Sequence, residues 1–236
     1  DGDGQLEILM KYDNQEEVAA GFPKAGNNGE YTLFECLKLD GTVLWWVNCG
    51  PNMGDFQNNE QNIVGYDWDR DGKSEALMRL CEGSTIHMAN GSVYTVGGPS
   101  WTNYRTAAYE GTQWFTYYGR EYLVYVNGMT GEPYQCIDFP LKRLESGESS
   151  IESAWGDGYG HRASKFFFGA PYLDGRHASI FLARGIYTRH KMIAYDVNPE
   201  THALTQRWKW TCNTGGPWFG QGYHNYSIAD VDWDGR

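Results

Sequence analysis

The chain has 236 residues, 16% of them aromatic, and a formal net charge of −11 at pH 7. A chain of this length can bury a sizeable core, and its acidic balance without a basic stripe argues against a nucleic-acid partner. No apolar run reaches the length that spans a membrane. The 30 glycines and the short alternating runs between Asp-Gly, Asn-Gly and Thr-Gly turns predict an all-β fold.

The first predicted element is an acidic turn. Asp1, Asp3 and Glu7 surround two glycines, and a strand-like run from Ile8 to Lys11 follows. Carboxylates at alternate positions of a tight turn present several oxygens on one side, which suits calcium, a hard cation with oxygen ligands. Because the motif begins at the first residue, we expect the chain to be a piece of a longer protein, truncated at both ends.

A hairpin and a complete acidic turn come next. Residues 33–47 alternate between apolar and polar around an Asp-Gly pair, which is typical of two strands joined by a tight turn. The acidic turn precedes a strand at 76–79 and has the predicted calcium ligands Asp67, Asp69, Asp71 and Glu75. An EF-hand would place its last ligand later in the loop and continue as a helix. We therefore predict a different kind of calcium loop, with a structural role.

The middle of the chain combines two insertions with a second hairpin. Residues 92–114 are rich in Gly, Thr, Tyr and Trp, and residues 141–162 end in a Gly-rich stretch. The hairpin between them spans 122–136 and turns at Asn127-Gly128. Long irregular insertions on a rigid scaffold usually lie on a functional face.

The last part repeats the pattern with changes. A degenerate turn at Asp174-Gly175 has Tyr172 and Ala178 at two positions where residues 67–75 have carboxylates, so it has lost its metal ligands. A strand at 179–183 and a hairpin at 192–210 follow. The chain closes with a fourth acidic turn, which has the predicted calcium ligands Asp230, Asp232 and Asp234.

The repeating unit is thus an acidic turn, an inner strand, a loop and a hairpin. Units of several antiparallel strands that repeat over tens of residues are typical of a β-propeller. We predict that residues 1–236 are part of a single calcium-binding β-propeller catalytic domain and include three complete blades and the start of a fourth. A parallel β-helix is the alternative fold, but its repeats are much shorter.

The five cysteines show no CxxC spacing, which disfavours zinc. Their odd number provides no complete disulfide framework. We therefore expect most of them to be small buried apolar residues.

Cationic and aromatic residues concentrate in three Gly-rich stretches, at 161–162, 183–190 and 220–227. If the fold brings them together, they would suit a carboxylated substrate, and glycine permits close approach of the backbone to a ligand. A lone Arg or His near a turn more often belongs to a surface ion pair, and we interpret His177 and His202 as surface residues. Tryptophans in irregular stretches, at 101, 114, 155 and 218, are candidates for stacking on sugar rings.

Six short motifs, when they occur together, are more specific to a family than the acidic turns are. They are WGDGYGHR (155–162), YLDG (172–175), ARGIYTR (183–189), LTQRW (204–208), GQGYHN (220–225) and ADVD (229–232). In these motifs the chain resembles the rhamnogalacturonan lyases of polysaccharide lyase family 11, and the resemblance covers most of its length. It implies an eight-bladed, calcium-rich β-propeller that cleaves the rhamnose–galacturonate backbone of pectin by β-elimination. It also implies a secreted, periplasmic or cell-surface enzyme whose partner is an acidic polysaccharide.

β-Elimination removes the proton at C5 of a uronate, α to the carboxylate, and expels the oxygen at C4. A cation on the carboxylate stabilises the charge that develops. The resemblance and this chemistry together predict the catalytic residues His224, Arg184, Arg189 and Tyr187. His224, with His190, is expected at a catalytic calcium or as the base, the two arginines on uronate carboxylates, and Tyr187 on the sugar. The predicted substrate-binding residues are Trp155, His161, Arg162, Gln221 and Asn225.

Functions of other classes remain open. A non-catalytic calcium propeller of the integrin-like kind, binding carbohydrate or protein, explains the acidic turns equally well but does not explain the cationic stretches. A quinone-dependent propeller dehydrogenase also has Trp-rich blades, but its calcium is a single central ion. Among lyases, an enzyme for another rhamnose–uronate linkage is the alternative.

Overall fold

Three antiparallel β-sheets form most of the regular structure in the computed structural model. It describes residues 2–12, 32–53, 63–104, 118–158, 160–212, 215–223 and 226–230. Helical structure in these ranges is limited to η1 (Pro51–Met53), α3 (Ile151–Trp155) and η2 (Arg162–Ser164). The predicted all-β class is confirmed, and no helix in the described part is long and apolar enough to cross a membrane.

Each sheet is built from strands that lie close together in the sequence, with one exception. The second sheet has the order β4 (Ile63–Tyr66), β5 (Glu75–Cys81), β8 (Glu121–Asn127) and β9 (Pro133–Asp138). The third has the order β10 (Phe166–Gly169), β11 (Ile180–Arg184), β12 (His190–Val197) and β13 (Leu204–Cys212). The exception is the first sheet, where β1 (Ile8–Tyr12), β2 (Leu33–Leu37) and β3 (Val43–Asn48) are joined by the later hairpin β6 (Thr85–His87) and β7 (Val93–Thr95).

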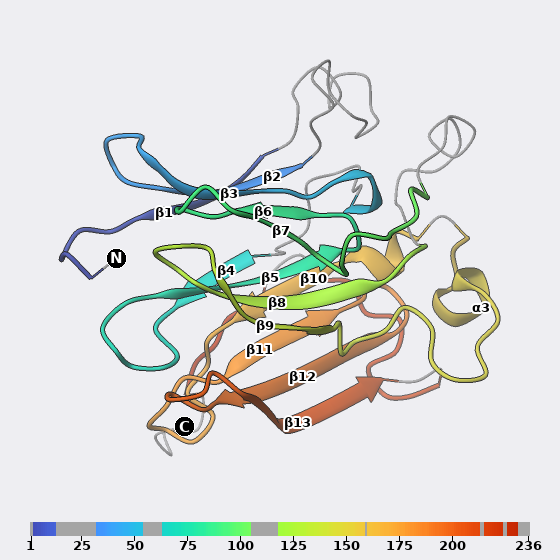
Figure 1. The fold of residues 1–236 in the computed structure, drawn as a ribbon. Coiled ribbons are helices and arrows are strands. Elements are labelled where there is room, and N and C mark those ends of the chain that lie inside the picture. Colours follow the sequence, from blue (N-terminus) through green and yellow to red (C-terminus); the bar gives the residue numbers. More distant parts are fainter. Residues whose placement is uncertain are drawn as a thin grey trace.

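The sheets stack as layers with the second sheet in the middle (Figure 1). One core cluster lies between the first and second sheets and includes Trp45 and Met78, and another lies between the second and third and includes Leu77 and Leu182. Successive residues of a strand face opposite sides, so neighbours in β5 enter different cores. Strand β5 is consequently buried along its whole length, including its charged residues.

The three predicted hairpins are confirmed. Strands β2 and β3, β8 and β9, and β12 and β13 pair as antiparallel neighbours, with Phe34 opposite Val47, Val124 opposite Cys136 and Ala194 opposite Trp208. Period-2 alternation around a turn was sufficient to locate them because the turn sets the register of the two strands.

The prediction of a β-propeller is wrong. The described residues form three stacked antiparallel sheets, and these do not close into a ring. The acidic turn and hairpin repeat specifies pairing within a sheet, whereas the way in which sheets are arranged depends on side chains that meet between them. The hairpin of β6 and β7 also crosses from the second unit of the repeat to the first sheet, where β6 pairs with β3.

All five cysteines are free thiols. Cys36, Cys49, Cys81 and Cys212 are buried, and Cys136 is half-buried. The expectation that most of them are small core residues is therefore confirmed.

Candidate functional site

The acidic turn at 67–75 joins β4 to β5 and gathers four carboxylates. One oxygen each of Asp67, Asp69, Asp71 and Glu75 lies within 4.8 Å of the others. Within the described ranges this is the only such group of three or more Asp, Glu, His or Cys side chains. A set made only of oxygen donors in a tight turn fits calcium.

Backbone N–H groups shape this turn. The N–H of Arg70 donates to Asp67 Oδ1 at 2.6 Å, and the N–H of Gly72 donates to Asp67 Oδ2 at 3.1 Å. Gly72 has a φ of 88°, in the left-handed region that favours glycine. The alternation of Asp and Gly therefore favours the shape of this turn.

Glu75 is the buried member of the group. Its Oε2 accepts hydrogen bonds from the Trp68 N–H at 2.9 Å and from the Tyr125 hydroxyl at 2.7 Å. Burial raises the pKa of Glu75 to about 7, and the charge of Asp69 adds to this, while the two hydrogen bonds act in the opposite direction. A cation at this turn would favour the ionised form.

The other acidic turns are less complete in the described residues. Asp3 accepts the Gln5 N–H at 2.8 Å and lies 3.7 Å from the Lys38 ammonium, and Glu7 is half-buried. Asp230 is exposed. Three of the predicted ligands lie outside the described residues, namely Asp1, Asp232 and Asp234. Their role stays a prediction.

The degenerate turn has one carboxylate, Asp174, which contacts His177 and, at 3.8 Å, Arg207 Nη2. Asp174 Oδ2 contacts His177 Nδ1 at 2.8 Å, and Gly175 again has a positive φ, of 72°. Tyr172 instead bonds Tyr66 of the second sheet, hydroxyl to hydroxyl, at 2.6 Å. The turn survives without metal ligands, as its sequence predicts.

His202 is not a free surface residue, contrary to the prediction. Its Nε2 lies 3.0 Å from Asp69 Oδ2, and its ring stacks on Tyr134 with centroids 3.7 Å apart. The loop between β12 and β13 therefore reaches the acidic turn of the neighbouring sheet. A contact between residues 133 positions apart leaves no local pattern in the sequence.

At the opposite end of the sheets, the Gly-rich stretches meet. The Thr188 hydroxyl donates to Trp155 O at 2.7 Å, and the Ile186 N–H donates to Arg162 O at 3.2 Å. The Tyr187 N–H donates to Gln221 O at 2.8 Å. We call residues 155–158, 160–162, 185–189 and 216–223 the loop cluster; it lies near α3 (Figure 1).

Tyr187, of the predicted catalytic set, is exposed. Its φ is 64°, an uncommon value for a bulky residue, and its side chain lies against His161 with ring centroids 6.0 Å apart. A Cβ at Gly222 would come within 2.7 Å of the Tyr187 ring, so glycine is needed there. Strain of this kind often marks a functional position.

Trp155, Arg184 and Arg189 lie deeper than the sequence suggested. Trp155 is fully buried, donates from Nε1 to Arg143 O at 2.6 Å, and has no exposed ring face for a sugar. Arg184 is also fully buried, and Arg189 lies 2.6 Å from Glu148 Oε1 and 5.6 Å from the Trp155 ring centroid. Trp155 and Arg189 are therefore the less exposed part of the loop cluster, and Arg184 is buried at the end of β11.

A buried carboxylate, Glu121, holds three arginines. Its oxygens lie 2.7 Å from Arg184 Nη1, 3.1 Å from Arg79 Nη1 and 3.2 Å from Arg143 Nη2. Burial alone would raise its pKa, but the three positive charges outweigh burial and lower the pKa to about 2. We call Glu121, Arg79, Arg143 and Arg184 the buried charge cluster.

His190 and Trp218 border an apolar groove of about 430 Å³ on the outer side of β12 and β13, together with Trp208, Trp210 and Gln221. His190 is buried, and burial lowers its pKa, which favours the neutral imidazole.

Arg162 lies apart from this groove and donates from its backbone N–H to Asp157 Oδ2 at 2.8 Å. His224 and Asn225 lie outside the described residues, so their roles stay predictions.

The sequence indicated Arg184 and Glu75 but not the other buried charged residues described above. Glu121 stands at the start of a predicted strand, Arg79 within another, and Arg143 and Lys191 had no motif around them. A charged residue in an otherwise apolar strand is the one available signal, because such a residue needs a partner when both faces of the strand are covered.

The fold and the site define a class of protein: an all-β domain with an oxygen-rich turn at one end of its sheets and cationic, aromatic loops at the other. Comparison with known families is more specific. Residues 1–236 match the family model for the C-terminal domain of rhamnogalacturonan lyase family 11. The chain belongs to this family.

Characterised relatives match the whole chain. It is 37% identical over 242 residues to the rhamnogalacturonan exolyase YesX and 34% identical over 241 residues to the rhamnogalacturonan endolyase YesW, both of Bacillus subtilis (strain 168). The crystal structure of YesX is similar with a TM-score of 0.77 at 35% identity, covering 100% of this chain and 36% of YesX. The chain spans 35% of the length of each of the two relatives.

Proposed function

We propose that this chain is part of a polysaccharide lyase that cleaves the rhamnose–galacturonate backbone of rhamnogalacturonan by β-elimination. The family match over residues 1–236 carries the proposal. Two relatives that the chain matches over its full length are named as rhamnogalacturonan lyases, one an exolyase and one an endolyase. Such a polymer is met outside the cytoplasm, so the proposal includes a secreted, periplasmic or cell-surface enzyme.

The reaction needs a base, a group that neutralises the uronate carboxylate and a protein surface that holds the polysaccharide. The base takes the C5 proton, the electron pair forms the C4–C5 double bond, and the bond from C4 to its oxygen breaks with a proton going to that oxygen. The loop cluster supplies Tyr187 and His161 as groups for a sugar, and Gln221 lies beside them. We place His224, three residues after Gln221, at the reacting uronate as base or as a ligand of a catalytic calcium.

Calcium is proposed at the acidic turn, where four carboxylates within 4.8 Å fit a hard cation. Asp67, Asp69, Asp71 and Glu75 would hold it. When bound, calcium supplies positive charge that offsets repulsion among the carboxylates. The turn and the loop cluster lie at opposite ends of β5 and β11, so we assign this ion a structural role.

Incubation of the full-length protein with rhamnogalacturonan, with and without a chelator, tests the proposal. The expected result is an unsaturated product with ultraviolet absorbance. Absence of product together with retained binding of the polymer would favour a non-catalytic carbohydrate-binding protein. Cleavage of a different rhamnose–uronate polymer instead would identify the alternative lyase.

The role of His224 is tested by His224→Ala in the same assay. We expect the rate of product formation to fall by about a hundredfold or more, the usual contribution of a general base. His177→Ala is the matched control, because this exposed histidine bonds Asp174 away from the loop cluster. An unchanged rate for His224→Ala would remove His224 from the mechanism.

A further inference from the structure

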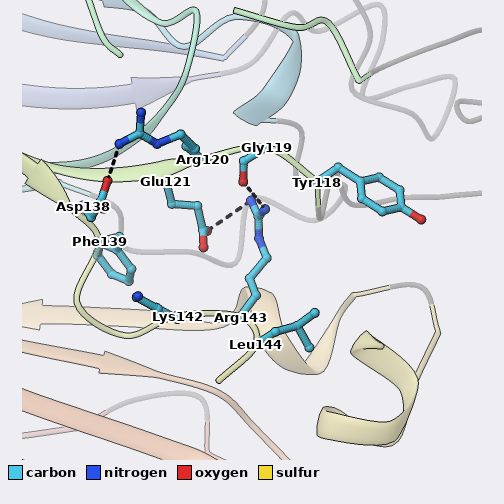
Figure 2. Close-up of a pocket in the computed structure, with 9 residues that line it drawn as sticks. All are labelled: Tyr118, Gly119, Arg120, Glu121, Asp138, Phe139, Lys142, Arg143 and Leu144. Carbon is cyan, nitrogen blue, oxygen red and sulfur yellow. Dashed lines mark hydrogen bonds and ion pairs between the residues drawn. The ribbon is translucent and has the colours of Figure 1, made fainter. Parts of the chain in front are cut away.

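A second pocket lies beside the loop cluster and is not used in the mechanism above. Its volume is about 340 Å³, and it is lined by the start of β8, the end of β9 and the loop that follows β9. Figure 2 shows Arg143 and Lys142 on the wall opposite Arg120 and Glu121. The pocket connects to the loop cluster through Arg143, whose carbonyl accepts the Trp155 indole N–H.

Positive charges outnumber negative charges around this pocket. Arg79, Arg143 and Arg184 share one carboxylate, that of Glu121. Arg120 is paired with Asp138 at 2.8 Å, and its backbone N–H donates to Glu82, which adds a further negative charge nearby. Lys142 lines the pocket, and no carboxylate among the described residues lies within ion-pair distance of its ammonium group. A local positive surplus in a chain of net charge −11 requires an explanation.

Arg143 presents an unused donor to this region. The residue is only 8% exposed; Nη1 donates to Gly119 O at 3.0 Å, and Nη2 faces Glu121. Its Nε is buried and makes no hydrogen bond within the described part of the chain. A buried guanidinium N–H without an acceptor costs free energy, and a carboxylate is the acceptor that matches guanidinium geometry best.

We infer that this pocket is a subsite for one carboxylate-bearing sugar, a uronate unit of the polymer, bound by Arg143 and Lys142. The inference rests on the proposed function, since it names the unit of the same substrate that this pocket takes. The volume is at the low end for small-molecule sites, which suits a single sugar rather than an oligosaccharide. The paired Arg120 and Asp138 form its rim.

The test is a calorimetric titration of the full-length protein with D-galacturonate and, separately, with D-galactose, which lacks the carboxylate. We expect Lys142→Glu to weaken galacturonate binding at this subsite about tenfold, because the change reverses a charge at the pocket. Among the described residues, the contact recorded for Lys142 is that of its backbone carbonyl with Lys191, and this variant keeps it. Arg176→Glu is the matched control, an exposed cation at the other end of the sheets.

A second measurement observes Arg143 directly in the wild-type protein, and a variant is needed only to assign its signal. The NMR signal of the Arg143 Nε–H, assigned with Arg143→Lys, should move with galacturonate and stay in place with galactose. Equal galacturonate binding by wild type and Lys142→Glu, together with an unmoved signal, would overturn the subsite.

Activity separates failure of the subsite from failure of the proposed function. If wild type cleaves rhamnogalacturonan and Lys142→Glu has a raised KM with unchanged kcat, the subsite contributes to substrate binding. If wild type cleaves and the variant has unchanged kinetics, the subsite is wrong and the lyase assignment stands. If wild type forms no unsaturated product but binds galacturonate at this pocket, the lyase assignment fails and the binding site stands.

Discussion

The two ends of strands β5 and β11 carry opposite charge and accommodate it in opposite ways. At one end, Asp67, Asp69 and Asp71 accept hydrogen bonds from the backbone N–H groups of their own turn, and Asp71 is exposed to solvent. At the other end, Arg79 and Arg184 are buried and share Glu121. Surface carboxylates can take a cation from solution, whereas buried arginines depend on the partner that the fold supplies. We therefore expect the cationic end to control folding and the acidic end to respond to metal.

Removing the charge at the buried end should have the largest effect. Glu121→Gln leaves three buried guanidinium groups without their shared carboxylate, which costs about 3–5 kcal/mol in the free energy of unfolding. Urea unfolding of the variant measures this loss. Glu132→Gln, on the exposed turn after β8, is the control and should stay within about 0.5 kcal/mol of wild type.

The Glu121 carboxylate should make the protein less stable at low pH. The pKa of Glu121 is about 2 in the folded protein against 4.5 as its ordinary value, so the folded state favours the ionised form. Its contribution is complete above about pH 4.5 and is lost as pH falls toward 2, on the order of 3 kcal/mol in all. Unfolding curves of wild type and Glu121→Gln should converge over this range. A difference that stays constant down to pH 2 would contradict the ion-pair explanation.

Metal should act at the acidic end only. Calcium at a hundredfold excess over its Kd should raise the free energy of unfolding by about 2.7 kcal/mol, and a chelator should reverse this. Asp71→Asn should abolish the response, because it removes one of the four carboxylates of the turn. Asp174→Asn should retain the response to calcium, because the degenerate turn has lost the other metal ligands and its carboxylate contacts His177 instead. Thermal unfolding with and without calcium distinguishes the two variants. A lost response in Asp174→Asn would contradict the assignment of calcium to the turn at 67–75.

The link between sheets at the acidic end should have a smaller effect. His202→Ala removes the stacking on Tyr134 and the contact with Asp69, which we expect to lower the free energy of unfolding by about 1 kcal/mol. His177→Ala, whose partner is the exposed turn of its own sheet, should change it by less than about 0.5 kcal/mol. Equal losses in the two variants would mean that the contact between sheets adds nothing.

Much of the local structure could be predicted from the sequence, because it depends on residues close together in the chain. The alternation in 33–47 and 122–136 identified hairpins, and the Asp and Gly spacing in 67–75 identified a turn that gathers four carboxylates. The sequence left open whether the Gly-rich stretches converge, and in the structure Tyr187, His161 and Gln221 do meet. Trp155 and Arg184 were predicted to face the substrate, but the structure buries both, since exposure depends on what packs over a residue.

The sequence by itself determined the all-β class, the hairpins, the acidic turns and the family. The first three depend on short-range pattern, namely period-2 alternation, glycine at positive φ and carboxylates at alternate positions, whereas the family was indicated by the resemblance of six short motifs. Only the tertiary structure decided that the sheets stack as layers, that β6 and β7 cross to the first sheet, and that Glu121 gathers three arginines. These features arise where distant segments pack together, and the free energy of such contacts depends on side chains whose positions no local pattern specifies.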